Sequence, residues 1–356
     1  MKETNSFDLN SYNYSLPKEL IAQYPCEKRD ESRLLCYKRD TERISHHKFY
    51  ELSDMLGEND VLVLNNTKVI PARFYAKTEN NKEIEILLVS PVSPDNLTWK
   101  ILASPKKHLH AVETLHATSL RHATSPPHAT SLLSINVIDP DTIRLNSYND
   151  LQIILNGIGT MPLPPYIKRK SETIDVDRYQ TIFAKESGAV AAPTAALHFT
   201  KELLNKIQNR GTEILYITLH VGPGTFLPIR TNDIREHKLL PERYYTDKEV
   251  WEKILQAKKN KKRIIACGTT TARTLEYIAL SDKLSGLNGL YITPGFEFKI
   301  VDSLITNFHL PKTSLLVLIS SFIEWKSVKK IYDEAIKEKY RFFSYGDAVF
   351  VSLQFT

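Results

Sequence analysis

The sequence predicts a two-domain protein of the α/β plus all-β class. A chain of 356 residues is long enough for about two domains. Residues 61–146 contain short runs in which apolar and polar residues alternate, which indicates an antiparallel sheet, such as a small barrel. From about residue 165, apolar runs alternate with helix-like segments, which indicates parallel βα units in either a barrel or a doubly wound sheet.

We predict that the β-rich block is inserted into the βα part of the chain. Residues 18–24 are helix-like, so the N-terminal segment can belong to the βα part, with the β block inserted into it. The proline-dense stretch at residues 161–167 is typical of an interdomain linker. We therefore expect a βα domain of residues 1–60 and 160–356 and an inserted β domain of residues 61–159.

The strands of the βα part are expected at three buried-type runs. These runs are residues 214–219, 263–267 and 289–293. Helices are expected at residues 250–262 and 271–280. A further helix is expected at residues 328–336, where apolar residues recur at helical spacing.

Composition excludes several classes of protein. Hydrophobic residues make up 42% of the chain and charged residues 25%, which excludes a disordered or fibrous chain. The longest apolar stretch, residues 315–323, is far shorter than the ~20 residues of a membrane span. The N-terminus lacks the apolar core of a secretory signal, and the three cysteines form no CxxC pair. These features predict a cytoplasmic protein without a membrane partner, and the net charge of +6 is compatible with a polyanionic partner.

A histidine-containing repeat interrupts the β block. The tetrapeptide His-Ala-Thr-Ser occurs three times within residues 108–134, and five of the 11 histidines lie between residues 108 and 128. The tract can be read as a metal site or as a low-complexity insertion. Because it lacks acidic or cysteine partners that would close a coordination shell, an insertion is favoured.

Polar, glycine-rich segments at strand ends are the candidates for chemistry, because no phosphate loop, GxGxxG fingerprint, HExxH or GxSxG motif is present. Residues 188–200, 221–226 and 268–276 combine small residues with hydroxyl groups near expected helix starts. Such segments let backbone amides approach a ligand, although tight turns and helix caps explain them equally well. Residues 306–314 and 340–347 add histidine, lysine and arginine side chains close to aromatic ones. The basic run at residues 258–263 is interpreted as a solvated helix end.

Taken together, these segments resemble one family. The matching motifs are Leu64-Asn-Asn-Thr-Lys-Val-Ile-Pro-Ala-Arg, Met161-Pro-Leu-Pro-Pro-Tyr-Ile, Gly188-Ala-Val-Ala-Ala-Pro-Thr-Ala, His198-Phe, His220-Val-Gly-x-Gly-Thr-Phe, Gly268-Thr-Thr, Tyr291-x-x-Pro-Gly-Phe-Glu-Phe, Thr306-Asn-Phe-His-Leu-Pro-Lys and Tyr340-Arg-Phe-Phe-Ser-Tyr-Gly-Asp-Ala. They occur in order between Phe7 and Val351. The chain is similar to the S-adenosylmethionine:tRNA ribosyltransferase-isomerases, which act in queuosine biosynthesis.

The resemblance implies a fold and a reaction. The fold is a distorted βα barrel with an inserted small antiparallel β-barrel domain. The ribosyl portion of S-adenosylmethionine is transferred to 7-aminomethyl-7-deazaguanine at the tRNA wobble position, and epoxyqueuosine, adenine and methionine are formed. S-Adenosylmethionine is a consumed substrate, no metal or additional cofactor is implied, and the partner is tRNA. We expect a monomer.

The reaction requires a base near the sulfonium and an acid that assists departure of adenine, and histidine titrates in a suitable range. The resemblance suggests that acid/base residues are among His198, His220, His309, Lys185 and Glu186, with the individual roles left open. Candidates for S-adenosylmethionine binding are Thr194, Gly222, Gly224, Thr225, Gly268, Thr269, Thr270 and Arg273. Candidates for tRNA contact are Lys168, Arg169, Asn307, Lys312, Arg341 and Tyr345.

Four positions depart from the family pattern. Ala196 stands where the family usually has glycine, Pro223 lies inside the His220-Val-Gly-x-Gly motif, and Ala272 stands where the family often has a larger residue. Leu240 stands where the family usually has a histidine, although Glu242 is retained. Two other hypotheses therefore stay open. One is a tRNA-binding protein of the same fold that has lost turnover. The other is a βα enzyme that acts on a small phosphorylated or nucleoside substrate without RNA.

Overall fold

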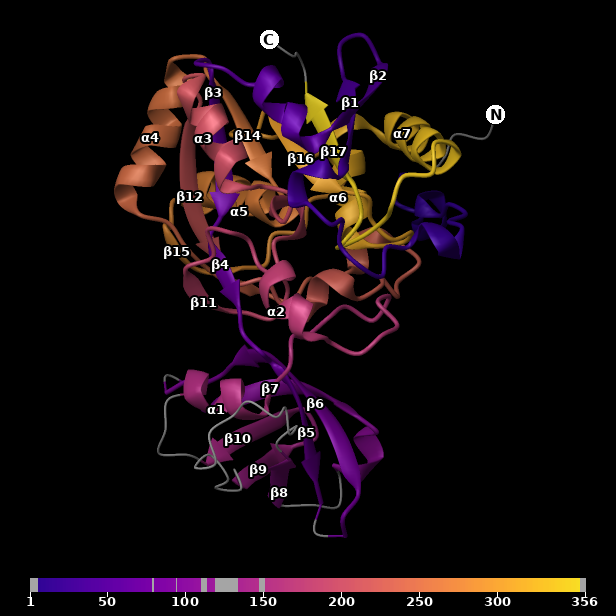
Figure 1. The fold of residues 1–356 in the computed structure, drawn as a ribbon, viewed down its shortest axis with the longest axis vertical. Coiled ribbons are helices and arrows are strands. Elements are labelled where there is room, and N and C mark those ends of the chain that lie inside the picture. The colour runs from indigo at the N-terminus through magenta and orange to yellow at the C-terminus, as the bar shows by residue number, and fades with distance from the viewer. Residues whose placement is uncertain are drawn as a thin grey trace.

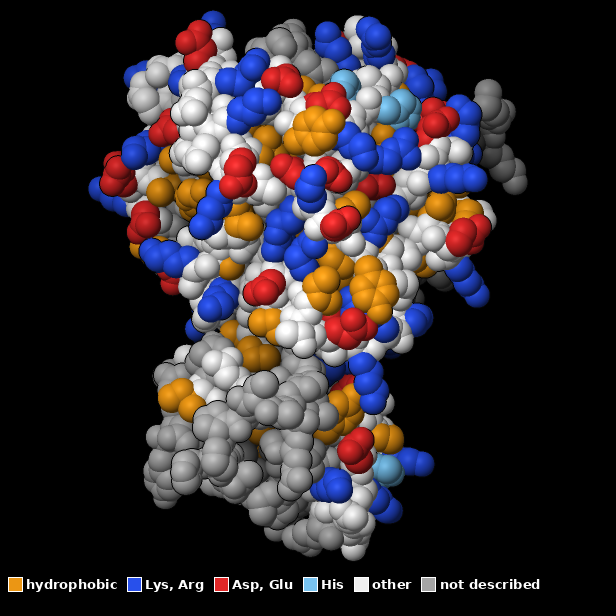
Figure 2. Space-filling view, in the orientation of Figure 1, with side chains coloured by type: hydrophobic (Ala, Val, Ile, Leu, Met, Phe, Trp, Pro, Cys, Tyr) orange, Lys and Arg blue, Asp and Glu red, His pale blue; other side chains and the backbone are white. Residues whose placement is uncertain are grey.

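The computed structural model describes residues 6–78, 80–93, 95–109, 114–118, 134–146 and 151–352. Figure 1 shows a large α/β body above a smaller domain of strands, joined by a narrow neck, and Figure 2 shows the surface of the same face. The described residues contain no helix that is long and apolar enough to cross a membrane.

A nine-stranded sheet forms the centre of the large domain, in the order β15-β13-β12-β3-β14-β16-β17-β1-β2. Its strands are β1 (Arg33–Lys38), β2 (Arg43–Lys48), β3 (Asp60–Asn65), β12 (Glu213–Leu219), β13 (Glu242–Tyr245), β14 (Arg263–Cys267), β15 (Ser285–Asn288), β16 (Ser303–Asn307) and β17 (Ala348–Ser352). The four neighbouring strands β12, β3, β14 and β16 are parallel. Their carboxyl ends therefore meet at one edge of the sheet.

Strand β3 shows why this sheet needs cover on both faces. All six of its residues are buried. Val61 and Val63 belong to one hydrophobic core, and Leu62 and Leu64 belong to another. Because side chains alternate along a strand, the two cores lie on opposite faces of the sheet.

Helices cover the two faces with apolar stripes. The first core takes residues from α4 (Lys248–Lys259), α5 (Thr269–Ser281), α6 (Ser314–Ile323) and α7 (Trp325–Lys337). The second takes residues from α3 (Lys201–Asn209) and the 3-10 helix η4 (Phe49–Met55). In α4 the buried residues are Trp251, Ile254 and Ala257, a spacing that places them on one helical face.

The smaller domain is a closed antiparallel barrel in the order β10-β7-β6-β5-β8-β9. Its strands are β5 (Arg73–Lys77), β6 (Glu83–Pro91), β7 (Thr98–Ser104), β8 (Thr114–Thr118), β9 (Ser134–Asp139) and β10 (Thr142–Asn146). Alternate residues of β6 (Ile84, Ile86 and Leu88) fill its core together with Leu155 of α1 (Leu151–Ile158). The antiparallel barrel that the sequence predicts is therefore present. Of the tract at residues 108–134, only residues 108–109, 114–118 (β8) and 134 are among the described residues.

Three features of the large domain differ from expectation. The run at residues 60–65 was expected in the β block, yet β3 pairs with β12 and β14 in the large sheet. Its continuous apolar pattern is typical of a strand buried on both faces. Residues 289–293 form no strand; β16 supplies the next parallel partner of β14. The strands form an open sheet with β15 and β2 at its edges. Parallel βα units are present as expected, but these strands do not close into a βα barrel.

Three chain segments meet near the neck, residues 67–73, 159–160 and 186–189. Strand β4 (Thr67–Val69) pairs in parallel with β11 (Glu186–Ala189), and Arg73 and Thr160 form an isolated antiparallel bridge below them. At Gly159 a Cβ atom would lie 1.9 Å from the carbonyl oxygen of Pro71. Only glycine allows the two backbones to approach this closely.

Candidate functional site

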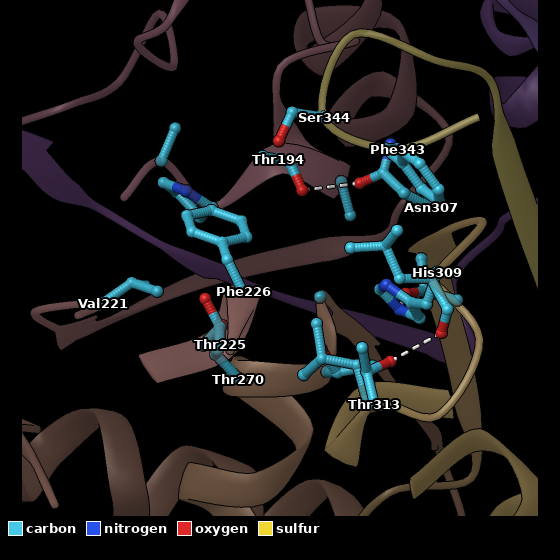
Figure 3. A pocket seen from close by; sticks show the side chains of 18 of the residues that line it. Thr194, Val221, Thr225, Phe226, Thr270, Asn307, His309, Thr313, Phe343 and Ser344 are labelled. Atoms are coloured by element: carbon cyan, nitrogen blue, oxygen red, sulfur yellow. Dashed lines mark hydrogen bonds between the residues drawn. The ribbon is translucent and has the colours of Figure 1, made fainter. Parts of the chain in front are cut away.

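Three segments meet at the carboxyl edge of the parallel strands. Residues 220–226 follow β12, residues 268–270 follow β14, and residues 307–310 follow β16. Val221, Thr225 and Phe226 of the first segment line a first cavity together with the other two segments (Figure 3). Residues 192–195 and the loop at residues 343–344 complete its wall. In open α/β sheets, ligands bind outside the carboxyl ends of the strands, so this cavity has the expected position for a ligand site.

The amino end of α5 opens into the first cavity. Gly268 precedes the helix with φ +97°, a left-handed conformation that favours glycine, and no side chain caps the first turn. Thr269 and Thr270 line the cavity but are only 4% and 7% exposed. Within the described part of the chain, neither hydroxyl has a hydrogen-bond partner, whereas the Thr271 hydroxyl donates to the Cys267 carbonyl at 2.7 Å. The helix therefore presents free amides and two free hydroxyls to a ligand.

A polar chain supports the opposite wall. The Thr194 hydroxyl donates to Asn307 Oδ1 at 2.7 Å, as the dashed line in Figure 3 marks. Asn307 Nδ2 lies 3.4 Å from His198 Nε2, and His198 Nδ1 hydrogen-bonds the Ser32 hydroxyl at 2.8 Å. Burial lowers the pKa of His198 to about 3, so its imidazole is neutral at physiological pH. His198 lies behind Asn307 and does not line the first cavity.

His309 lines the first cavity from the loop after β16. Its Nε2 atom hydrogen-bonds the Thr306 hydroxyl at 2.9 Å, and its backbone amide donates to the Tyr332 hydroxyl at 2.8 Å. Burial lowers its pKa to about 3. The ring is therefore neutral and fixed in orientation.

A second, larger cavity of roughly 1000 Å³ lies between the two domains. Barrel residues, including Trp99 and Leu102, line one side, and the segments around β13 line the other. Val221 and Thr225 line both cavities, which therefore adjoin at that point.

His220 faces the second cavity. Its Nδ1 atom hydrogen-bonds the Thr67 hydroxyl at 2.9 Å. Gly188, with φ +150°, lies against the ring, and a Cβ atom there would come within 2.9 Å of it. Burial and the nearby Arg243 lower the pKa of His220. His220 is only partly buried. Its Nδ1 atom is fixed by a hydrogen bond, and its side chain has access to the larger cavity.

A buried ion pair supports the glycine-rich turn after β12. Glu242 Oε2 pairs with Arg273 Nη2, and their side chains are only 5% and 4% exposed. Glu242 Oε1 also accepts the Gly222 amide hydrogen bond at 2.9 Å. Arg273 lines the second cavity, and its buried Nη1 atom has no hydrogen-bond partner among the described residues. Such a donor is suited to a carboxylate.

The remaining acid/base candidates lie elsewhere. Lys185 and Glu186 are exposed and form an ion pair at 3.6 Å. Neither lines the first or the second cavity. Lys185 and Glu186 therefore form an ion pair outside both cavities.

Several tRNA candidates have internal partners. Arg169 forms two hydrogen bonds with Asp175, at 2.7 and 2.8 Å, and the buried Tyr345 hydroxyl donates to the same carboxylate at 2.7 Å. Asn307 is 2% exposed inside the first cavity. These contacts argue against direct roles of the three residues in holding a tRNA, because their polar groups are already occupied or buried.

The other tRNA candidates are more accessible. Lys168 is exposed on the loop before α2 (Thr173–Arg178), and Lys312 is partly exposed, with Nζ 2.8 Å from Asn10 Oδ1. Arg341 is partly exposed and donates to Cys26 Sγ at 2.8 Å and to the Tyr24 carbonyl.

Sequence reasoning missed two parts of the site. Glu242 was noted only as a retained residue, although it joins Arg273 and Gly222. Leu240 lines the second cavity and is 51% exposed. A Cβ atom on Gly224 would contact Leu240 at 3.4 Å, so this position, where the family usually has histidine, directly faces the glycine-rich turn.

No group of three or more His, Cys, Asp or Glu side chains in the described segments is arranged to hold a metal ion. Most of the histidine tract, including His110, His122 and His128, lies outside those segments.

The fold and site define a class of mixed α/β proteins that carry an antiparallel barrel domain and adjoining polar cavities at the carboxyl edge of parallel strands. Residues 9–351 match the family described as queuosine biosynthesis protein. The chain belongs to this family.

Known relatives cover almost the whole chain. The S-adenosylmethionine:tRNA ribosyltransferase-isomerase of Sulfurihydrogenibium sp. (strain YO3AOP1) is 46% identical over 344 residues, which span 96% of this chain and 99% of that protein. The protein of the same name from Thermodesulfovibrio yellowstonii is 44% identical over 354 residues, with the same coverage of both chains. The crystal structure of S-adenosylmethionine tRNA ribosyltransferase from Thermotoga maritima is 34% identical and has a TM-score of 0.54. It covers 96% of this chain and 99% of that one.

Proposed function

We propose that this protein transfers and isomerises the ribosyl portion of S-adenosylmethionine onto 7-aminomethyl-7-deazaguanine at the wobble position of tRNA. Epoxyqueuosine-tRNA, adenine and methionine are the products. The observation that carries the proposal is the convergence of family motifs that are distant in sequence. The segments that begin at His220, Gly268 and Asn307 line two adjoining cavities. The larger cavity is at the upper end of the range of about 300–1000 Å³ that small-molecule sites occupy.

Within the proposed site, S-adenosylmethionine lies across the two cavities. Arg273 Nη1 is assigned to its carboxylate, because this buried donor has no partner among the described side chains. The α5 amides and the Thr269 and Thr270 hydroxyls are assigned to the nucleoside portion. The protein is proposed to act as a cytoplasmic monomer without a further cofactor.

His220 is our leading candidate for proton transfer. It lines the cavity between the domains, which is large enough to admit both substrates, and it is only partly buried. His198 and His309 are fixed and neutral, so we assign them to holding the cavity wall.

The test is mass spectrometry on a reaction of the purified protein, S-adenosylmethionine and tRNA that carries the aminomethyl precursor. Release of adenine together with the mass gain on the wobble base is the expected result. If tRNA binds and neither product forms, the alternative of a tRNA-binding protein without turnover is supported, and Leu240→His is then the variant to test for recovery. A protein that does not bind tRNA at low salt would instead fit a small-molecule enzyme.

Thr270→Val is expected to weaken S-adenosylmethionine binding by about five- to tenfold, because valine keeps the shape and removes one hydrogen bond. Isothermal titration calorimetry measures the dissociation constant. Thr271→Val is the matched control on the same helical turn, because the Thr271 hydroxyl bonds the Cys267 carbonyl. Equal affinities for the two variants would contradict the assignment of Thr270.

His220→Gln is expected to lower the single-turnover rate of adenine release by at least about 100-fold, the usual contribution of a general acid or base. His237→Gln serves as the control, since His237 packs on Tyr291 and lines neither cavity. A rate within twofold of the wild type would remove His220 from the chemistry.

A further inference from the structure

A small third hollow lies directly behind the first cavity. Its lining includes Cys26, Arg29, Arg178 and His198. Ser344 lines both this hollow and the first cavity, so the two are separated by one side chain. No role in the reaction proposed above uses this hollow.

Three arginines from separate elements converge around it. Arg29 begins the 3-10 helix η3 (Arg29–Glu31), Arg178 ends α2, and Arg341 lies in the loop between α7 and β17. Each is partly exposed. Arg29 and Arg178 line the hollow, and Arg341 contacts Cys26, which also lines it.

The guanidinium groups are held by neutral acceptors. Arg29 donates to the carbonyls of Leu197 and Asp177 at 3.0 and 2.7 Å. Arg178 donates to the carbonyls of Glu27 and Cys26 at 3.0 and 2.6 Å. Arg341 donates to Cys26 Sγ at 2.8 Å and to the Tyr24 carbonyl. These contacts hold the arginines in place without neutralising their charge.

No carboxylate forms an ion pair with any of the three among the residues that the structure describes, whereas neighbouring Arg169 is neutralised by Asp175. The nearest acid from the C-terminal loop, Asp347, accepts the backbone amides of Arg33 and Arg341 instead of a guanidinium. Arg178 Nε is buried and has no hydrogen-bond partner in the described chain. Burial and the charge of Arg178 lower the pKa of Arg29, as expected for cations held together without an anion.

We propose that Arg29, Arg178 and Arg341 bind a phosphodiester group of the RNA strand whose base enters the first cavity. Guanidinium groups match phosphate oxygens in charge and in hydrogen-bond geometry. The hollow adjoins the first cavity through Ser344, so a phosphate there belongs to a nucleotide close to the reacting base. The identity of the strand rests on the proposed function.

The first test is binding of a fluorescent anticodon stem-loop RNA, followed by anisotropy over a series of salt concentrations. Arg178→Gln and Arg29→Gln are each expected to weaken binding three- to tenfold at low salt. They should also reduce the slope of log Kd against log salt by about 0.7, the value for one phosphate contact on a single strand. Lys259→Gln, at the exposed end of α4, is the charge-matched control with an unchanged slope.

The variant Arg178→Lys distinguishes a role of Arg178 in phosphate binding from a role in holding the surrounding loops. Lysine keeps the positive charge but cannot hold both carbonyls that Arg178 holds. If the site binds phosphate, this variant retains the wild-type salt slope while its melting temperature falls with that of Arg178→Gln. If Arg178 serves only to hold loops, lysine and glutamine variants have the same slope as the wild type, and the proposal is overturned.

The contacted phosphate can be identified with RNAs in which one linkage at a time is a neutral methylphosphonate. We expect one linkage of the loop to weaken wild-type binding, with no further loss at that linkage in Arg178→Gln. Additive losses at every linkage, with Arg178→Gln losing as much affinity as the wild type at each one, would overturn the proposal. Wild-type protein that fails to bind RNA would contradict the proposed function as well; bound RNA with variants equal to Lys259→Gln would contradict this inference alone.

Discussion

Glu242→Ala is expected to lower the free energy of unfolding by about 3–5 kcal/mol, the cost of breaking a buried ion pair by removing one partner. The change leaves Arg273 buried without its carboxylate and releases the Gly222 amide. Because both groups adjoin the proposed S-adenosylmethionine site, we also expect substrate binding to be lost. Urea denaturation measures the first effect, and calorimetric titration measures the second.

The matched control is Glu249→Ala. Glu249 pairs with Lys253 on α4, where their side chains are 78% and 48% exposed, so its loss should have little effect on stability. The double change of Glu242 and Arg273 to methionine should recover most of the stability, since well-packed apolar pairs can replace buried ion pairs. It should not recover substrate binding. If Glu242→Ala and Glu249→Ala have the same free energy of unfolding, the pair does not have the energetic role assigned to it.

Local patterns predicted the elements whose apolar residues recur at a regular spacing along the sequence. The alternation in β6 predicted a barrel strand, and the apolar spacing in α4 and α7 predicted helices. Strand β3 was assigned to the wrong domain because its partners, β12 and β14, begin about 150 and 200 residues further along the chain. Periodicity reports that a strand is buried, but it does not report which strands bury it.

The candidate site shows the same limit. Motifs located the segments at Gly268 and His309, because small and polar residues at strand ends are visible locally. They did not reveal that Asp175 forms an ion pair with Arg169, or that Arg29 and Arg178 have no carboxylate partner among the described residues. Whether an arginine is free depends on side chains from distant elements, so only the folded structure distinguishes these cases.

Acidification provides a second large effect, because two buried histidines are neutral in the folded protein. Burial lowers the pKa of His198 and of His309 to about 3, from a value of about 6.5 in the unfolded chain. Between these values the unfolded chain binds more protons than the folded one, so stability falls as pH decreases. The stabilisation is fully present above pH 6.5 and is lost progressively toward pH 3. At pH 5 each histidine is expected to cost about 2 kcal/mol relative to neutral pH, or about 4 kcal/mol for the pair.

Urea denaturation at several pH values between 5 and 7.5 measures this dependence. His309→Gln should remove about half of the slope. The same slope in the wild type and in His309→Gln would show that other groups carry the acid sensitivity. The expected sign also bears on catalysis. A histidine that resists protonation this strongly can hold the cavity wall through a neutral hydrogen bond, but it is a weak base near neutral pH. The pH dependence of stability should therefore follow His198 and His309, and that of adenine release should follow His220, whose partial exposure leaves it able to exchange protons.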